Sequence, residues 1–244
     1  MAFYDEEDGE VMGIEDERIV YAVQHTQVLR LPSQSLATFG TTRVNYYLLT
    51  TPVYAELVSQ EETVVREGKV SAARPQVVTP SYLSRLEGFG ENARKYFEMI
   101  IREHGPHVPG LLYSYRNEPK GFSLVSDKLD VVATSLSARI DKEGDKLAAI
   151  IQGVDELWDV SLLKFISELT ESSLRDNIAE LGRRGMLSMD QSGIPGDARI
   201  RIESLFQKVT RGELDPSELK RELDRWDVFP EYEDRFLNLF RKRW

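Results

Sequence analysis

Hydrophobic and polar residues alternate along much of the first third of the chain. Within residues 41–51 (TTRVNYYLLTT), Val44, Tyr46 and Leu48 fall on one face of an extended segment, and mainly polar residues fall on the other. A period of two is typical of a strand with one buried face. Residues 18–25 (RIVYAVQH) are also rich in β-branched and aromatic residues, which favour strands. Both segments are therefore predicted to be strands.

Two further segments extend this pattern. Residues 62–73 (ETVVREGKVSAA) place Glu67 and Gly68 between two apolar runs. Glycine supplies the positive φ angle that a two-residue hairpin turn requires, so the pattern predicts a hairpin. Residues 110–116 (GLLYSYR) predict one more strand. Together these segments predict an antiparallel sheet of roughly three to five strands.

From residue 90 onwards, the apolar residues recur at helical spacing. Asp215 stands before a proline, which marks a helix start. Ser126 or Asp127 is expected to cap another helix that ends at Gly144, and Asp197 is expected to cap a third. The predicted helices are residues 91–104, 126–143, 145–152, 155–170, 173–184, 197–210, 216–226 and 230–242.

The switch in period predicts an α+β fold. Residues 18–118 are expected to form a mostly antiparallel β-sheet region with one or more packed helices, and residues 127–244 a C-terminal α-helical bundle. The polar residues 117–127 (NEPKGFSLVSD) are the expected boundary between the two domains.

Charge is concentrated at the N-terminus. The net charge is −10, and residues 1–17 hold eight acidic residues and no Lys or Arg. The other 33 acidic residues nearly balance the 31 basic ones. A segment with many like charges and few apolar residues does not offset its ordering entropy, so a disordered acidic tail is predicted for residues 1–17. Cysteine is absent and the chain has no long apolar run, which favours a cytoplasmic protein without membrane contact.

Histidine offers a weak metal-site candidate. His104 and His107 flank Gly105-Pro106, which breaks the helix between them. The two imidazoles therefore do not lie one turn apart on one helical face, as a shared metal site on a helix requires. The sequence predicts no bound metal and no cofactor.

A polar and aromatic cluster follows the histidines. Tyr113, Tyr115, Arg116 and Glu118 stand close together before a loop, and such a set can line a pocket. One alternative function is therefore an enzyme or small-molecule binder with a pocket near residues 104–118. No sequence motif for a catalytic nucleophile or a metal-activated water is present, so no catalytic residue is predicted.

Residues 155–203 suggest a second alternative. Leu174, Ile178 and Leu181 have the apolar spacing of a recognition helix, and Gly185 follows where the chain would enter a hairpin wing. In this register the segment resembles the winged-helix class. The three apolar residues are predicted to be buried whether or not the resemblance is correct.

The DNA-binding interpretation depends on the exposed face of that helix. Arg175, Asn177, Arg183 and Arg184 are its candidate DNA-binding residues. Neighbouring acidic residues would repel phosphate, and residues 197–210 match a helix over a longer stretch than they match a wing strand. The observation that separates the two interpretations is whether residues 186–203 form a β-hairpin or a helix.

The main hypothesis is a non-catalytic adaptor, regulatory or assembly protein that binds an unidentified protein partner. The C-terminal helix carries Phe236 and Phe240 and ends in a basic, aromatic segment. Aromatic and arginine side chains provide much of the binding energy at many interfaces. Trp244, Arg241 and Arg243 are therefore the predicted contacts with the partner.

Overall fold

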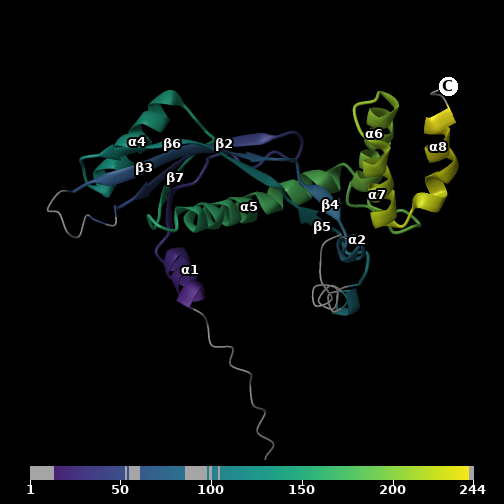
Figure 1. Cartoon of the computed structure of the whole chain (residues 1–244), viewed down its shortest axis with the longest axis horizontal. Coiled ribbons are helices and arrows are strands. Elements are labelled where there is room, and N and C mark those ends of the chain that lie inside the picture. Colours follow the sequence, from purple (N-terminus) through teal and green to yellow (C-terminus); the bar gives the residue numbers. More distant parts are fainter. Residues whose placement is uncertain are drawn as a thin grey trace, which may run out of the picture. The chain divides into compact units, whose positions relative to one another are not determined.

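The structure is a computed structural model that describes residues 14–52, 54, 61–85, 98, 101–103 and 105–241. It has the predicted α+β class, with a five-stranded sheet and C-terminal helices (Figure 1). None of the helices in these ranges is both long enough and apolar enough to cross a membrane. The chain divides into two compact units, residues 1–73 with 115–175 and residues 74–114 with 176–244.

The first unit contains the five-stranded sheet. Its strand order is β1-β7-β2-β3-β6, and all neighbouring pairs are antiparallel except β2 and β7. Figure 1 shows helix α4 on one face of the sheet and helix α5 on the other. The elements are α1 (Ile14–Gln24), β1 (Gln27–Arg30), β2 (Thr42–Thr50), β3 (Thr63–Ala72), β6 (Tyr115–Val125), α4 (Leu129–Glu143), β7 (Ala148–Gln152) and α5 (Trp158–Arg183), the last of which continues into the second unit.

The predicted strand at residues 41–51 is confirmed as β2. Val44, Tyr46 and Leu48 are buried, while Arg43 is exposed. On the opposite face, Leu49 packs with Ile150 and with the buried stripe of α4. Burial on both faces at this end explains why the alternation weakens after Tyr47.

The prediction of a strand at residues 18–25 is wrong, because residues 18–24 belong to helix α1 and His25 forms a turn after it. The Lys164 ammonium donates to the carbonyls of Val23 and Thr26, at 3.0 and 2.7 Å. These bonds satisfy backbone groups at the end of α1, where a helix lacks internal partners. They come from a residue far along the chain, so local composition does not reveal them. Residues 14–17, which we assigned to the acidic tail, form the first turn of α1, and residues 1–13 lie outside the described residues.

Three other local predictions also need correction. Glu67-Gly68 is not a turn, because β3 is one continuous strand. Residues 117–125 belong to β6, which pairs with β3, so they do not form the expected connection between domains. Residues 148–152, within a segment predicted to be helical, form β7, parallel to β2. Residues 148–151 are buried, and a short, fully buried apolar run does not distinguish a strand from a helix.

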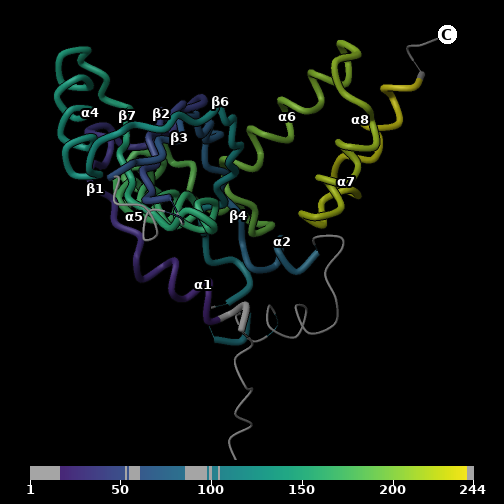
Figure 2. The backbone as a smooth tube through the Cα atoms, turned by 60° about the vertical axis from the view of Figure 1, so that its left-hand side comes forward, coloured from purple at the N-terminus to yellow at the C-terminus, as the bar shows by residue number. Residues whose placement is uncertain are grey.

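The second unit is mainly helical. It consists of β4 (Gln76–Val78), α2 (Pro80–Ser84), β5 (Gly110–Leu112), α6 (Gly196–Thr210), α7 (Pro216–Trp226) and α8 (Phe229–Arg241). Val78 and Tyr82 pack with α6, α7 and α8 in one hydrophobic core. Figure 2 shows these three helices side by side. The helices predicted for 197–210, 216–226 and 230–242 are thus confirmed within about one residue at most ends.

Two of the predicted helix caps are confirmed, and the other two are wrong. The Asp215 carboxylate accepts the Ser217 N–H, and Gly144 ends α4 in the left-handed region, both as predicted. Lys128, rather than Ser126 or Asp127, is the N-cap of α4. Asp197 does not cap α6, because its side chain accepts hydrogen bonds from the segment around β4 instead.

Candidate functional site

The C-terminal helices α6, α7 and α8 surround a surface hollow. Asp215 starts α7 after a short turn from α6. Asp227 then takes a left-handed conformation, with φ of 60°, and ends α7 directly before α8. Because both connections are short, three consecutive helices pack against one another. Residues from the end of α6, the start of α7 and the end of α8 can therefore share one hollow.

Aromatic side chains connect the helices. Phe206 of α6 stacks on Tyr232 of α8, with ring centroids 5.5 Å apart. Within α8, the Phe236 ring packs edge-on with the rings of Phe229 and Phe240, with centroids again 5.5 Å apart. Phe236 is buried, whereas Phe240 is 43% exposed. The aromatic core therefore continues to the surface at Phe240.

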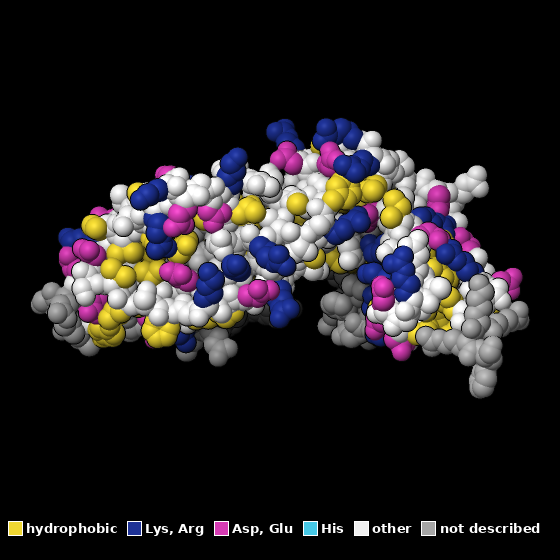
Figure 3. All heavy atoms as spheres, turned by 90° about the horizontal axis from the view of Figure 1, so that it is seen from above, with side chains coloured by type: hydrophobic (Ala, Val, Ile, Leu, Met, Phe, Trp, Pro, Cys, Tyr) yellow, Lys and Arg dark blue, Asp and Glu magenta, His cyan; other side chains and the backbone are white. Residues whose placement is uncertain are grey.

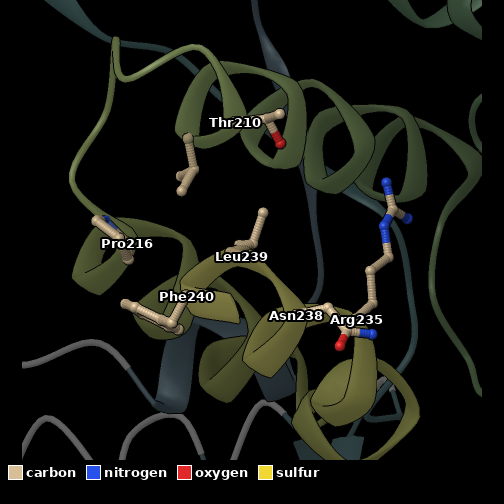
Figure 4. Close-up of a pocket in the computed structure, with 7 residues that line it drawn as sticks. Thr210, Pro216, Arg235, Asn238, Leu239 and Phe240 are labelled. Atoms are coloured by element: carbon tan, nitrogen blue, oxygen red, sulfur yellow. The ribbon is translucent and has the colours of Figure 1, made fainter. Parts of the chain in front are cut away.

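A groove opens beside Phe240. It has a volume of about 290 Å³. A second hollow of about 200 Å³ shares Thr210, Arg235 and Leu239 with it. Figure 4 shows Thr210 on α6 facing Leu239 on α8, with Pro216 and Phe240 at one side. We call the two hollows together the α6–α8 groove; its lining is Phe206, Gln207, Val209, Thr210, Arg211, Pro216, Arg235, Asn238, Leu239 and Phe240.

Two arginines give one end of the groove a positive charge. The Arg235 guanidinium donates to both carboxylate oxygens of Glu203, at 2.6 and 2.7 Å, and lies 4.0 Å from the Phe206 ring centroid. Arg235 is therefore held in place and its charge is partly balanced. Arg211 is exposed and has no ion-pair partner among the described residues. An anionic group in the groove would consequently meet Arg211 first.

The Glu203–Arg235 pair predicts a small pH dependence of stability. The hydrogen bonds from Arg235 hold the pKa of Glu203 below its ordinary value. A lowered folded-state pKa means that the pair stabilises the fold above the unfolded-state pKa of about 4.3. This stabilisation is lost as the pH falls through the folded-state value. Because both side chains are about half exposed, we expect a contribution of at most about 1 kcal/mol.

Denaturant unfolding of wild type and Glu203→Gln across the acidic range tests this expectation. The variant should be less stable at neutral pH, and the two curves should converge below the pKa of Glu203. Glu213→Gln is the matched control, since Glu213 is exposed and has no ion-pair partner within the described ranges. A constant difference between wild type and Glu203→Gln at all pH values would contradict it.

A buried ionic network lies elsewhere in the second unit. Glu222 accepts hydrogen bonds from Arg201 (2.8 and 2.6 Å), Trp226 Nε1 (3.0 Å) and Tyr82 Oη (3.0 Å). Burial, followed by the charge of Glu222, raises the pKa of Tyr82. Both carboxylate oxygens of Glu222 therefore accept hydrogen bonds from within the protein. We assign this network a structural role.

The histidine candidates do not form a metal site in the part of the chain that the structure describes. His107 is exposed, and its ring lies against Gly193, where an added Cβ would be 2.7 Å from Nδ1. His107 also lines a hollow of about 130 Å³, smaller than typical ligand pockets. No three metal-ligating side chains gather in these residues. His104 lies outside the described residues, so the absence of a metal stays a prediction.

The polar and aromatic residues at 113–118 form separate contacts in the two units, and a pocket near residues 104–118 stays a prediction. The Tyr113 hydroxyl accepts from Asn177 at 2.9 Å, in the second unit. Tyr115 bonds to the Thr170 hydroxyl, in the first unit. Arg116 and Glu118 are exposed on β6 and lie 3.9 Å apart. Arg116 and Glu118 are two positions apart and so share one face of the strand, whereas the Tyr115 side chain lies on the other face.

The winged-helix register is wrong, because α5 is one continuous helix through residues 170–173. Residues 196–210 form helix α6, and the only bridge described within residues 186–195 joins Met189 and Pro195. The predicted burial also differs. Leu174 and Ile178 are exposed, while Ser173 and Asn177 share the buried face with Leu181. The Ser173 hydroxyl accepts the Leu36 N–H, which explains a polar residue on that face.

The candidate DNA-binding residues do not form a common basic surface. Asn177 is 1% exposed and bonds to Tyr113, so it is not available to a base edge. Arg183 and Arg184 both form ion pairs with Glu180, at 2.6 and 2.8 Å, and Arg175 is exposed. Figure 3 shows basic and acidic side chains interspersed on the face that it displays. DNA binding stays an untested prediction without a supporting geometry.

The predicted partner contacts Arg241, Arg243 and Trp244 follow directly after Phe240, which lines the groove. Arg243 and Trp244 lie outside the described residues, and Arg241 is the last residue of α8. Sequence patterns singled out Phe240 of the groove lining but not Thr210, Arg211, Pro216 or Leu239. Thr210 and Arg211 are polar residues beside an apolar stripe, a pattern that is common on helices and does not indicate a site. No protein family, curated protein or solved structure matched the chain in comparison, so the site is identified from geometry alone.

Proposed function

We propose that this protein is a non-catalytic adaptor, regulatory or assembly protein, and that it binds a protein partner in the α6–α8 groove. The observation that carries the proposal is an open, partly apolar groove at the place where the aromatic core of three helices reaches the surface. A concave apolar surface with a polar rim suits the anchor side chain of a partner. The cytoplasmic location expected from the sequence belongs to the same proposal.

The chemistry of the groove indicates the kind of segment that it binds. Val209, Pro216 and Leu239 offer apolar contacts for one bulky aliphatic or aromatic side chain. Arg211 at the second hollow offers a cation for a carboxylate. Because the groove lies between helices, an amphipathic helical segment with one apolar anchor and a neighbouring acidic residue fits it best.

Selection from a displayed peptide library on the full chain tests this proposal. Peptides enriched on the wild type should combine an apolar residue with a nearby Asp or Glu, and their affinity should fall with salt, because the charges are exposed. Thr210→Trp should fill the groove and weaken binding by more than about tenfold. Arg211→Glu should weaken it by roughly tenfold through charge reversal. Fluorescence anisotropy of a labelled peptide measures both effects.

Two variants on the same helix serve as matched controls. Ser204→Trp adds the same ring at an exposed position outside the lining, and Lys208→Glu reverses an exposed charge outside it. Both should bind the peptides as the wild type does. The proposal fails if no peptide is enriched, or if Thr210→Trp binds the enriched peptides as tightly as Ser204→Trp.

A further inference from the structure

Strand β6 forms an edge of the five-stranded sheet and is unusually exposed. It pairs with β3 on one side, and no described strand pairs with its other side. Phe122 is 76% exposed and Leu124 is 48% exposed. These two residues are two positions apart, so both side chains lie on one face of the sheet. An edge strand with free backbone groups and exposed apolar side chains is a template for another strand.

The two halves of β6 differ in how well they resist such pairing. Glu67 lies opposite Gly121 and Gly68 opposite Pro119, which leaves Lys120 as the extra residue of a bulge. Proline, lysine and a bulge are the features that protect natural sheet edges. Residues 121–125 (GFSLV) have no charge, no proline and no bulge. Only this second half of the edge is open to pairing.

We propose that residues 121–125 pair with the same residues of a second copy of this chain, as antiparallel strands about a two-fold axis at Ser123. This geometry places Phe122 of each copy opposite Leu124 of the other, and Gly121 opposite Val125. Every cross-strand pair is then apolar or small and uncharged, which stabilises antiparallel pairing. The two sheets join into one continuous sheet through their edges.

A second copy fits this edge because the segment is complementary to itself. A two-fold interface brings the same patch of both chains together, so each side chain must suit its symmetry partner. The alternation of large apolar and small residues around Ser123 meets this condition. The contact is short, so the dimer is expected to be concentration-dependent rather than permanent. It is independent of the α6–α8 groove.

Sedimentation velocity of the full chain over a wide range of concentration tests the inference. The wild type should shift from the mass of one chain towards twice that mass as the concentration rises. Phe122→Lys with Leu124→Lys places lysine opposite lysine in both cross-strand pairs. This double variant should raise the dissociation constant by roughly tenfold or more. Both positions are exposed, so circular dichroism should show an unchanged fold.

A charge-swap variant tests the register itself. Phe122→Lys with Leu124→Glu places a lysine opposite a glutamate at both pairs, so it should restore much of the dimer that the double lysine variant loses. Leu163→Lys, which changes another exposed apolar residue of the same unit, should leave the dimer unchanged. A wild type that stays monomeric at all concentrations would overturn the inference. A dimer that persists in the double lysine variant, or that the charge swap does not restore, would overturn it too.

Discussion

Replacing Asp197 with alanine is expected to destabilise the second unit by about 2–4 kcal/mol. The Asp197 carboxylate is 1% exposed, forms an ion pair with Arg74 and accepts the Val77 N–H at 3.1 Å. Arg201 lies 3.8 Å from it and is itself largely buried. Removing the carboxylate takes away the ion-pair partner of the partly buried Arg74 and leaves the buried Val77 N–H without its acceptor, while Arg201 keeps its bonds to Glu222. The loss of a hydrogen bond to a charged group, together with a buried donor left without an acceptor, is among the more costly effects that a substitution can have.

Tryptophan fluorescence offers a specific measurement of this effect. The chain has three tryptophans, and Trp226 packs in the core of the second unit. In a background with Trp158→Phe and Trp244→Phe, denaturant unfolding followed at Trp226 reports this unit alone. Asp197→Asn should cost less than Asp197→Ala, because an amide oxygen can still accept the Val77 N–H. Asp215→Ala, which removes an exposed N-cap, should cost about 1 kcal/mol. Equal losses for Asp197→Ala and Asp215→Ala would contradict the prediction.

Local sequence patterns correctly predicted those helices and strands whose signals lie within the element itself. The alternation in β2 reflects the burial of Val44, Tyr46 and Leu48 on one face, and α7 begins after Asp215 because the cap and the proline act locally. Helix α1 and strand β7 were misassigned for the opposite reason. Lys164 satisfies the last carbonyls of α1 from another element, and β7 depends on its neighbours β1 and β2. Such long-range contacts leave no local pattern in the sequence.

The candidate site was predicted only in part for a similar reason. The aromatic residues of α8 stood out, and Phe240 does line the groove. Thr210 and Leu239 lie on different helices, and only the turns before and after α7 bring them together. Asn177 was expected on the exposed face of its helix because it is polar, whereas it is buried and donates to the Tyr113 hydroxyl. Polar residues on a buried face are where pattern analysis is weakest.

Gly68 is the clearest case of a residue whose role depends on its neighbour, and it gives the second large prediction. A Cβ added at Gly68 would lie 2.3 Å from Tyr46 Oη and 2.5 Å from its Cζ. The buried Tyr46 ring crosses β3 at this glycine, and its hydroxyl donates to Asn117 Oδ1 of β6 at 3.1 Å. Glycine is therefore required for the close approach of an aromatic ring, not for a turn.

Gly68→Ala is expected to destabilise the first unit by about 1–3 kcal/mol, because the Tyr46 ring must leave its site and lose its bond to Asn117. The same substitution should change sign in a Tyr46→Val background. Without the ring the new methyl group fills space, and alanine in a strand is favoured over glycine by roughly 0.5–1 kcal/mol. Unfolding of the four proteins of this double-mutant cycle, followed at Trp158 with Trp226 and Trp244 changed to phenylalanine, measures the coupling. If Gly68→Ala is equally destabilising in both backgrounds, the glycine is required for its backbone conformation and not for the tyrosine that crosses it.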